Sequence, residues 1–84
     1  MEALARQYLR AARRHEAETA LETLVANEPL RESAHRALME LWAAAGERAR
    51  ALGHYDALVV LLQREVGSPP ARETQAFVQR IRSA

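Results

Sequence analysis

The chain repeats itself at a spacing of 34 residues, and this repeat limits the possible fold more than any other feature. When the sequence is shifted against itself by 34 positions, Leu4 falls on Leu38 and Tyr8 falls on Trp42. The further matches are Ala11 with Ala45, Ala12 with Gly46, Arg14 with Arg48, Ala17 with Ala51, Leu21 with Tyr55, Leu24 with Leu58 and Val25 with Val59. A period of this length is typical of stacked units, none of which can bury its apolar face alone. Such units are scaffolds for contacts with other proteins, so the sequence favours binding over catalysis.

Apolar residues recur at steps of three and four along most of the chain, which is the spacing of amphipathic helices. The pattern predicts helices at about residues 2–12, 15–26, 29–45, 47–66 and 71–82. We expect a turn at Arg13–His15, and Pro29 is suited to the first turn of the third helix. Gly46 and Gly67 are suited to the positions just past helix ends. No segment alternates apolar and polar residues as a strand does. The sequence therefore predicts an all-α fold, a stack of two antiparallel helical pairs plus a C-terminal capping helix.

The composition bounds the size and the class of the protein. We expect a single domain over residues 1–84, with repeat units at about 1–29 and 30–66 and the capping helix at about 71–82. Hydrophobic residues make up 49% of the chain, too many for a disordered segment. The formal net charge of +1 lacks the basic excess of most nucleic-acid-binding domains. The absence of cysteine excludes disulfides and thiolate metal sites. No apolar run is long enough to span a membrane, and we expect a cytoplasmic location.

The second half of the chain carries a more specific pattern than the repeat itself. It reads Pro29-Leu30-Arg31-Glu32-Ser33-Ala34-His35, Leu38-Met39, Ala43-Ala44-Ala45-Gly46, Ala51-Leu52 with Tyr55, and Leu62 with Glu65-Val66-Gly67 and Pro70. From about Ala17 to Ile81 this pattern resembles the bacterial transcriptional activator domain, the tetratricopeptide-like module of antibiotic regulatory proteins and related large regulators. The resemblance implies a helical domain that sits beside a winged-helix DNA-binding domain and serves dimerisation, partner contacts or signal relay. We expect no enzymatic activity and no cofactor, and contact with DNA only through another domain of the parent protein.

The inner helices of a tetratricopeptide stack line a concave groove. The resemblance to that repeat implies the groove residues Glu2, Arg6, Leu9, Arg10, Ser33, Arg36, Glu40 and Ala43. Three of these are arginines, which can pair with carboxylates through two parallel hydrogen bonds. The groove is therefore a candidate site for an acidic peptide, although solvated arginine-rich faces are common in a chain that has no lysine. A generic tetratricopeptide adaptor that binds an acidic peptide remains the alternative to a module of a transcriptional regulator.

The helix predicted at 47–66 has a wide apolar surface, which needs a partner on more than one side. Val60 and Leu61 are the candidate residues for self-association, and we expect a homodimer through this helix or through an exposed chain end. Trp42 is another candidate anchor for a partner protein, but the repeat requires a core residue at its position.

Other constellations give weaker indications of chemistry. Glu32 and His35 have the spacing used in di-iron bundles, but such sites need two copies of the motif and further carboxylates. The serines have no readable histidine-and-acid arrangement, and the glycines are too far apart for a phosphate-binding loop. Direct DNA binding is a less favoured alternative, in which Arg48 and Arg50 follow a helix-turn-helix bend at Gly46. The residues that follow them are needed by the core, so we expect proteins rather than DNA as partners.

Overall fold

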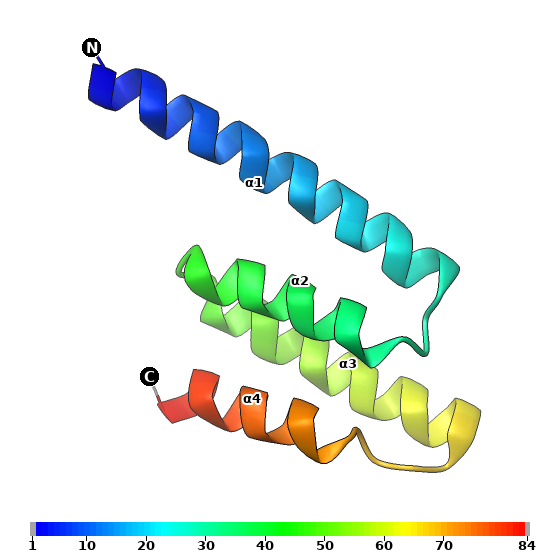
Figure 1. The fold of residues 1–84 in the computed structure, drawn as a ribbon. Coiled ribbons are helices and arrows are strands. Elements are labelled where there is room, and N and C mark those ends of the chain that lie inside the picture. The colour runs from blue at the N-terminus through cyan, green and yellow to red at the C-terminus, as the bar shows by residue number, and fades with distance from the viewer. Residues whose placement is uncertain (1, 84) are drawn as a thin grey trace.

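The computed structural model describes residues 2–83, without the side chains of residues 2–4 and 8, as helices joined by short connections (Figure 1). α1 spans Glu2–Asn27, α2 spans Glu32–Ala44, α3 spans Arg48–Val66 and α4 spans Arg72–Ser83. Residues 2–83 contain no strand, so the predicted all-α class is confirmed. The helices form a stack of the tetratricopeptide-like kind, in which α2 contacts each of the other three.

α1 is a single helix where the sequence predicts two. The expected turn at Arg13–His15 is wrong, and one helix replaces the first helical pair. Neither glycine nor proline occurs in α1, and most of its residues are alanine, arginine, leucine or glutamate, which favour helix. In the second unit the turn falls on Gly46, whose φ of 82° is left-handed. The matching position in the first unit is Ala12, for which a left-handed turn is costly, so the helix continues.

Two helices end at glycines, as predicted, but one predicted helix start is wrong. Gly46 and Gly67 lie just past the ends of α2 and α3 with positive φ, as predicted. The prediction that Pro29 begins the next helix is wrong, because α2 begins later, at Glu32. The Nε2 atom of His35 lies 2.8 Å from the carbonyl oxygen of Pro29, and this contact holds the proline in the turn before the helix.

One cluster of buried side chains joins α2, α3 and α4. Its members are Leu38, Met39, Trp42, Ala51, Val78 and Ile81. Leu21 and Val25 of α1 pack against the same cluster. The second half of α1 therefore belongs to the core.

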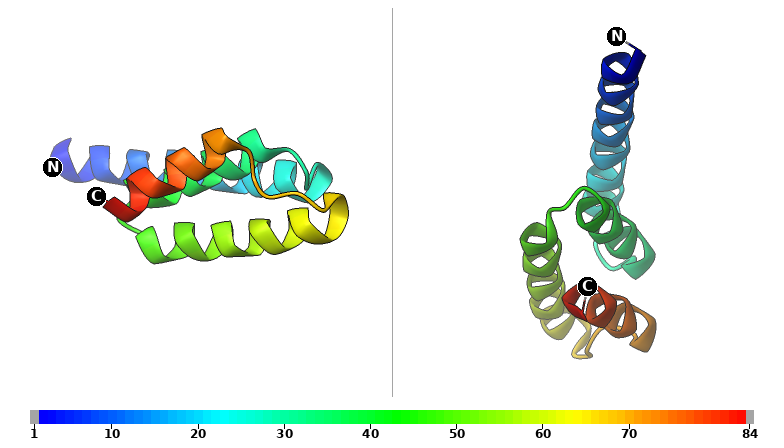
Figure 2. Two further views of the ribbon diagram at one scale, coloured as in Figure 1. Left: turned by 90° about the horizontal axis from the view of Figure 1, so that it is seen from below. Right: turned by 90° about the vertical axis from the view of Figure 1, so that its left-hand side faces the viewer.

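The first half of α1, residues 2–14, stands away from this core, and we call it the arm. Figures 1 and 2 show it projecting from the other helices. Every described side chain from residue 5 to residue 17 is exposed, and Leu9 is 52% exposed. The straight course of α1 thus divides the first repeat unit into a packed half and an exposed half.

Polar contacts attach α4 to the first turn of α2. The Glu32 carboxylate accepts hydrogen bonds from the backbone N–H of Ala71 at 2.9 Å and from the Thr74 hydroxyl at 2.8 Å. The Thr74 oxygen in turn accepts a hydrogen bond from Arg36 at 2.8 Å. Arg36 also lies 3.6 Å from the Glu73 carboxylate. Glu32 of α2 therefore accepts the hydrogen bond of a backbone N–H at the start of α4. In most helices a capping residue of the same helix has this role.

Candidate interaction surface

The exposed side of α2 forms the floor of two adjoining hollows. The first, the α1–α2 hollow, has a volume of about 540 Å³ and is lined by Arg10, Arg13, Arg14, Ala37, Glu40, Leu41, Ala44 and Ala45. The second, the α2–α4 hollow, has a volume of about 320 Å³ and is lined by Glu40, Ala43, Ala44, Arg48, Phe77, Arg80 and Ile81. Glu40 and Ala44 belong to both linings, so the hollows meet across the exposed side of α2.

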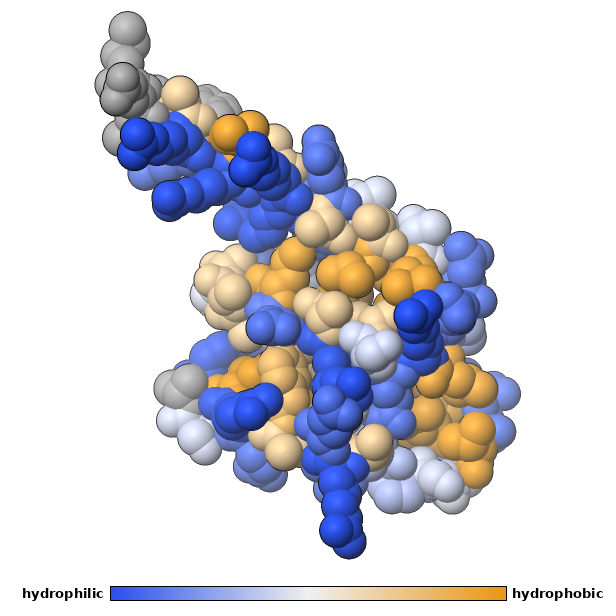
Figure 3. Space-filling view, viewed as in Figure 1, coloured by the Kyte–Doolittle hydropathy of each residue, from blue (hydrophilic) through white to orange (hydrophobic). Residues whose placement is uncertain are grey.

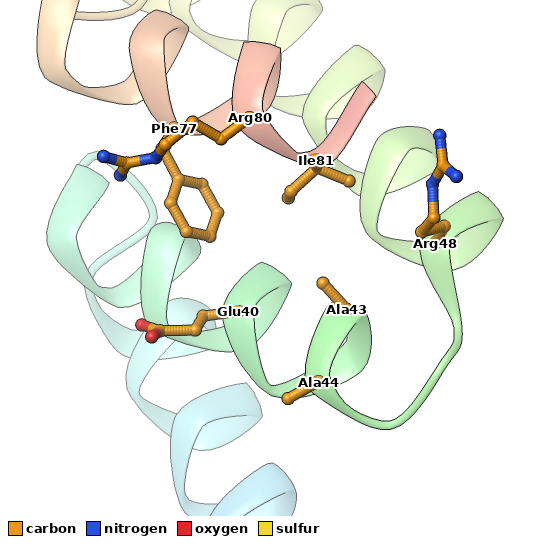
Figure 4. A pocket seen from close by; sticks show the side chains of 7 residues that line it. All are labelled: Glu40, Ala43, Ala44, Arg48, Phe77, Arg80 and Ile81. Atoms are coloured by element: carbon orange, nitrogen blue, oxygen red, sulfur yellow. The ribbon is translucent and has the colours of Figure 1, made fainter. Parts of the chain in front are cut away.

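The α2–α4 hollow has an apolar floor and a charged rim (Figure 4). Phe77 and Ile81 reach from α4 toward the alanines of α2. The Arg80 guanidinium lies 5.7 Å from the centre of the Phe77 ring. Arg48 donates a hydrogen bond to the backbone carbonyl of Arg82 at 3.1 Å. An apolar centre with a polar rim is the usual arrangement of a protein-binding surface.

The α1–α2 hollow is more positively charged. Arg10, Arg13 and Arg14 form its α1 wall, and its floor consists mainly of small side chains from α2. None of these three guanidiniums has an ion-pair partner among the described residues. Figure 3 shows apolar atoms gathered on the surface below the mainly hydrophilic arm. The arrangement can hold the apolar side of a helix while the arginines attract its carboxylates.

The structure brings only some of the predicted groove residues together. Arg10 and Glu40 line the α1–α2 hollow, and Glu40 and Ala43 line the α2–α4 hollow. The remaining positions are separate: Arg6 and Leu9 are exposed on the arm, Ser33 is exposed at the start of α2, and Arg36 is engaged with Thr74 and Glu73. The side chain of Glu2 lies outside the described residues.

Several lining residues were missed by the sequence reasoning. Arg13 and Arg14 were assigned to a turn, and the α4 residues Phe77 and Arg80 were assigned only to a capping helix. The available signal was their spacing, because Arg13 and Arg14 lie three and four residues after Arg10 and share one side of a continuous helix.

Trp42 is 5% exposed at the junction of three helices, so it serves the core rather than a partner. Its indole N–H donates a hydrogen bond to the Glu18 carboxylate of α1 at 2.8 Å. This hydrogen bond is the main cause that lowers the pKa of Glu18, and the charge of Arg50, 3.0 Å away, acts in the same direction. The Arg50 guanidinium also lies over the Trp42 ring, 4.5 Å from its centre. These contacts attach the second half of α1 to α2 and α3.

Two histidines form another partly buried polar pair. His35 is 2% exposed, and its Nδ1 atom lies 2.8 Å from Nε2 of His54. The Pro29 carbonyl can only accept a hydrogen bond, so the Nε2 atom of His35 carries the proton and donates it to that carbonyl. The Nδ1 atom of His35 is then an acceptor, and it receives a hydrogen bond from the Nε2–H of His54. Burial lowers the pKa of His54, and the neighbouring His35 adds to this effect. Glu32 and His35 therefore have separate structural roles, and the described residues contain no cluster of three or more potential metal ligands.

The residues considered for DNA binding and for self-association have different environments. Arg48 is held by the Arg82 carbonyl, and Arg50 pairs with Glu18, so both arginines are engaged within the chain.

Val60 is 63% exposed on α3, whereas Leu61 is half-buried. Val66, at the end of α3, is 53% exposed, and two scattered valines form only a small apolar patch.

The fold and the exposed surface together define a class of protein. An all-helical stack of short units with an arginine-rimmed apolar surface belongs to the tetratricopeptide-like scaffolds. Across residues 2–83, none of the helices has the length and apolar character needed to cross a membrane.

Comparison with known families is more specific. The family model described as Bacterial transcriptional activator domain matches residues 1–82, and the chain belongs to this family. The domain indicates a regulator of the transcriptional activator type, and the family is not a known enzyme family. No curated protein and no solved structure matches the chain.

Proposed function

We propose that this chain is a non-catalytic module of a bacterial transcriptional regulator that acts in the cytoplasm and binds a protein segment on the exposed side of α2. The observation that carries the proposal is the α1–α2 hollow, where three arginines without ion-pair partners among the described residues border a floor of small side chains. Membership of a regulatory family supports this role. Contact with DNA then belongs to another domain of the parent protein.

The charge and shape of the hollow favour an acidic amphipathic helix as the bound segment. The short side chains of Ala37 and Ala44 allow a helix to approach α2 closely, and Leu41 offers it an apolar contact. Carboxylates on the side of that helix can reach Arg10 and Arg14, which favour paired, charge-assisted hydrogen bonds.

A pair of synthetic peptides tests this proposal. The probe is a labelled amphipathic peptide of leucine and glutamate, and its matched control has lysine at every glutamate position. Fluorescence anisotropy should detect binding of the acidic peptide only, with an affinity that falls as salt increases. Substituting Arg10→Glu and Arg14→Glu together should weaken binding at least about tenfold, because both contacts become repulsive.

A charge-matched variant controls for the change in net charge. Arg64 and Arg72 are exposed and outside both hollows, so Arg64→Glu with Arg72→Glu should leave binding close to that of the unmodified chain. Equal binding of both peptides, or equal weakening by both variants, would contradict the proposal.

Self-association through α3 is a second candidate, favoured by the 63% exposure of Val60. A dimer of this kind should dissociate when Val60→Ser is introduced alone or with Leu61→Ser. Light scattering behind a sizing column measures the change, and an unaltered mass would remove α3 from consideration.

A further inference from the structure

The charge distribution along α1 points to a partner for the exposed arm, and we propose that two copies of this chain pair antiparallel through their α1 helices. This inference rests on the proposed function, since it names a second copy of the chain as the bound segment. The acidic second half of α1 in one copy would lie against the arm of the other, next to the α1–α2 hollow.

α1 is divided by charge into two opposite halves. The first half carries Arg6, Arg10, Arg13 and Arg14, and no acidic residue occurs from position 5 to position 15. The second half carries Glu16, Glu18 and Glu22, with Glu28 just past the helix end, and no basic residue occurs from position 16 to position 28. Antiparallel pairing of two such helices places each basic half against an acidic half. The pattern is therefore self-complementary under two-fold symmetry.

Within one chain the same pattern is unfavourable. Arg6 and Arg10, and Arg10 and Arg14, are each four residues apart and therefore neighbours on the helix surface. Like charges at this spacing destabilise a helix. In the second half of α1, Arg50 of α3 lies 3.0 Å from Glu18 and 3.9 Å from Glu22, so the uncompensated like charges are those of the arm. The charge of Arg14 acts on Glu18, but no carboxylate among the described residues lies within ion-pair distance of an arginine of the arm. A second copy supplies the opposite charges that the arm lacks.

The 34-residue repeat explains why a helix is expected beside the arm. The arm matches α2, and the positions matched by Leu4 and Tyr8 are the buried Leu38 and Trp42. α2 packs against α3, the helix that follows it, because the chain turns back at Gly46. α1 has no such turn, so the arm cannot fold back onto the second half of its own helix. The second half of α1 from another copy can take that place, as in domain swapping.

Exchanging charges between the two halves tests this pairing directly. The arm variant carries Arg6→Glu and Arg10→Glu, and the second-half variant carries Glu16→Arg and Glu22→Arg. Light scattering behind a sizing column should give a dimer for the unmodified chain. Each variant alone brings like charges together, so its dimer dissociation constant should rise at least about tenfold. An equimolar mixture should restore the dimer, because each interface then joins opposite charges.

Cysteine crosslinking locates the contact. The chain has no cysteine, so Leu9→Cys in one preparation and Thr19→Cys in another introduce unique thiols. Antiparallel pairing about position 14 places Arg6 of one copy opposite Glu22 of the other, and residue 9 opposite residue 19. The mixed preparations should form a disulfide-linked dimer under oxidation, and more of it than either preparation alone.

The outcomes separate this inference from the proposed function. The charge-matched Arg64→Glu and Arg72→Glu variant should remain dimeric. A strictly monomeric chain, an arm variant that dimerises normally, or a mixture that does not recover overturns α1 pairing. If the acidic peptide still binds the chain in that case, the proposed function stands. If a monomeric chain also ignores the peptide, both fail. If Val60→Ser alone dissociates the dimer, the interface lies on α3 and α1 pairing is overturned.

Discussion

The hydroxyl of Thr74 connects α4 to α2, and its removal should measurably destabilise the domain. Thr74→Val preserves the shape of a side chain that is 0% exposed, but removes its hydrogen bonds to Glu32 and Arg36, both at 2.8 Å. Hydrogen bonds to charged groups contribute about 1.5–3 kcal/mol each. Glu32 and Arg36 are partly exposed, so water compensates part of the loss. We expect the free energy of unfolding to fall by about 1–2 kcal/mol.

A loss of this size is readily detected in a small domain. For 84 residues, roughly 0.05–0.15 kcal/mol per residue gives a total stability of roughly 4–13 kcal/mol. The melting temperature should therefore fall by roughly 5–15 °C. Thermal and urea unfolding followed by the helical circular dichroism signal measure both quantities.

A double-mutant cycle with Glu32→Gln shows whether the hydroxyl acts through Glu32. If it does, the two substitutions together should destabilise the protein less than the sum of the single effects, with a coupling of about 1 kcal/mol. Thr74→Ser, which keeps the hydroxyl, should retain the coupling. A valine variant as stable as the unmodified chain, or effects that add to within about 0.5 kcal/mol, would refute this account of the attachment.

Three further predictions concern the core, the glycines and the histidines. Met39→Ala, at a position 0% exposed, should lower the free energy of unfolding by about 2–5 kcal/mol in urea titrations, and a loss below about 1 kcal/mol would contradict its core role. Gly53→Ala should stabilise by about 0.5–1 kcal/mol, because this glycine lies inside α3 with open space at its Cβ position. Gly46→Ala should instead destabilise by about 1–2 kcal/mol, because its φ of 82° is left-handed, and effects of equal sign would contradict the reasoning. Since the pKa of His54 is lowered on folding, its contribution to stability should be present above about pH 6.5 and be lost as the pH falls below this value. Urea midpoints across this range should show the decline, and His54→Gln should reduce it.

Three of the helices could be predicted closely because local signals agree with the packing. Gly46 and Gly67 combine helix termination with the positive φ that few other residues adopt, and the apolar spacing between them is continuous. α1 was predicted wrongly as two helices with a turn at Arg13–His15, next to Ala12, the residue that the repeat matches with Gly46. The helix continues through Ala12 because alanine has the highest helix propensity of all residues.

The candidate binding surface was predicted less completely than the fold. Arg10, Glu40 and Ala43 are groove positions that the resemblance to the tetratricopeptide repeat implies, and they do line the hollows. Arg36 is another of these positions, but its hydrogen-bond partner Thr74 is 38 residues away and draws its guanidinium to α4. Local periodicity identifies a helix face but does not specify the distant side chains that will occupy it.

The first turn of α2 makes hydrogen bonds both to the connection from α1 and to the start of α4. Glu32 holds the start of α4, and His35, three residues later, holds the Pro29 carbonyl in the connection from α1. Within residues 2–83, no Cα atom of α1 lies within 8 Å of a Cα atom of α4. Their positions are nevertheless mechanically linked through this turn, because loosening it would weaken both the entry into α2 and the docking of α4.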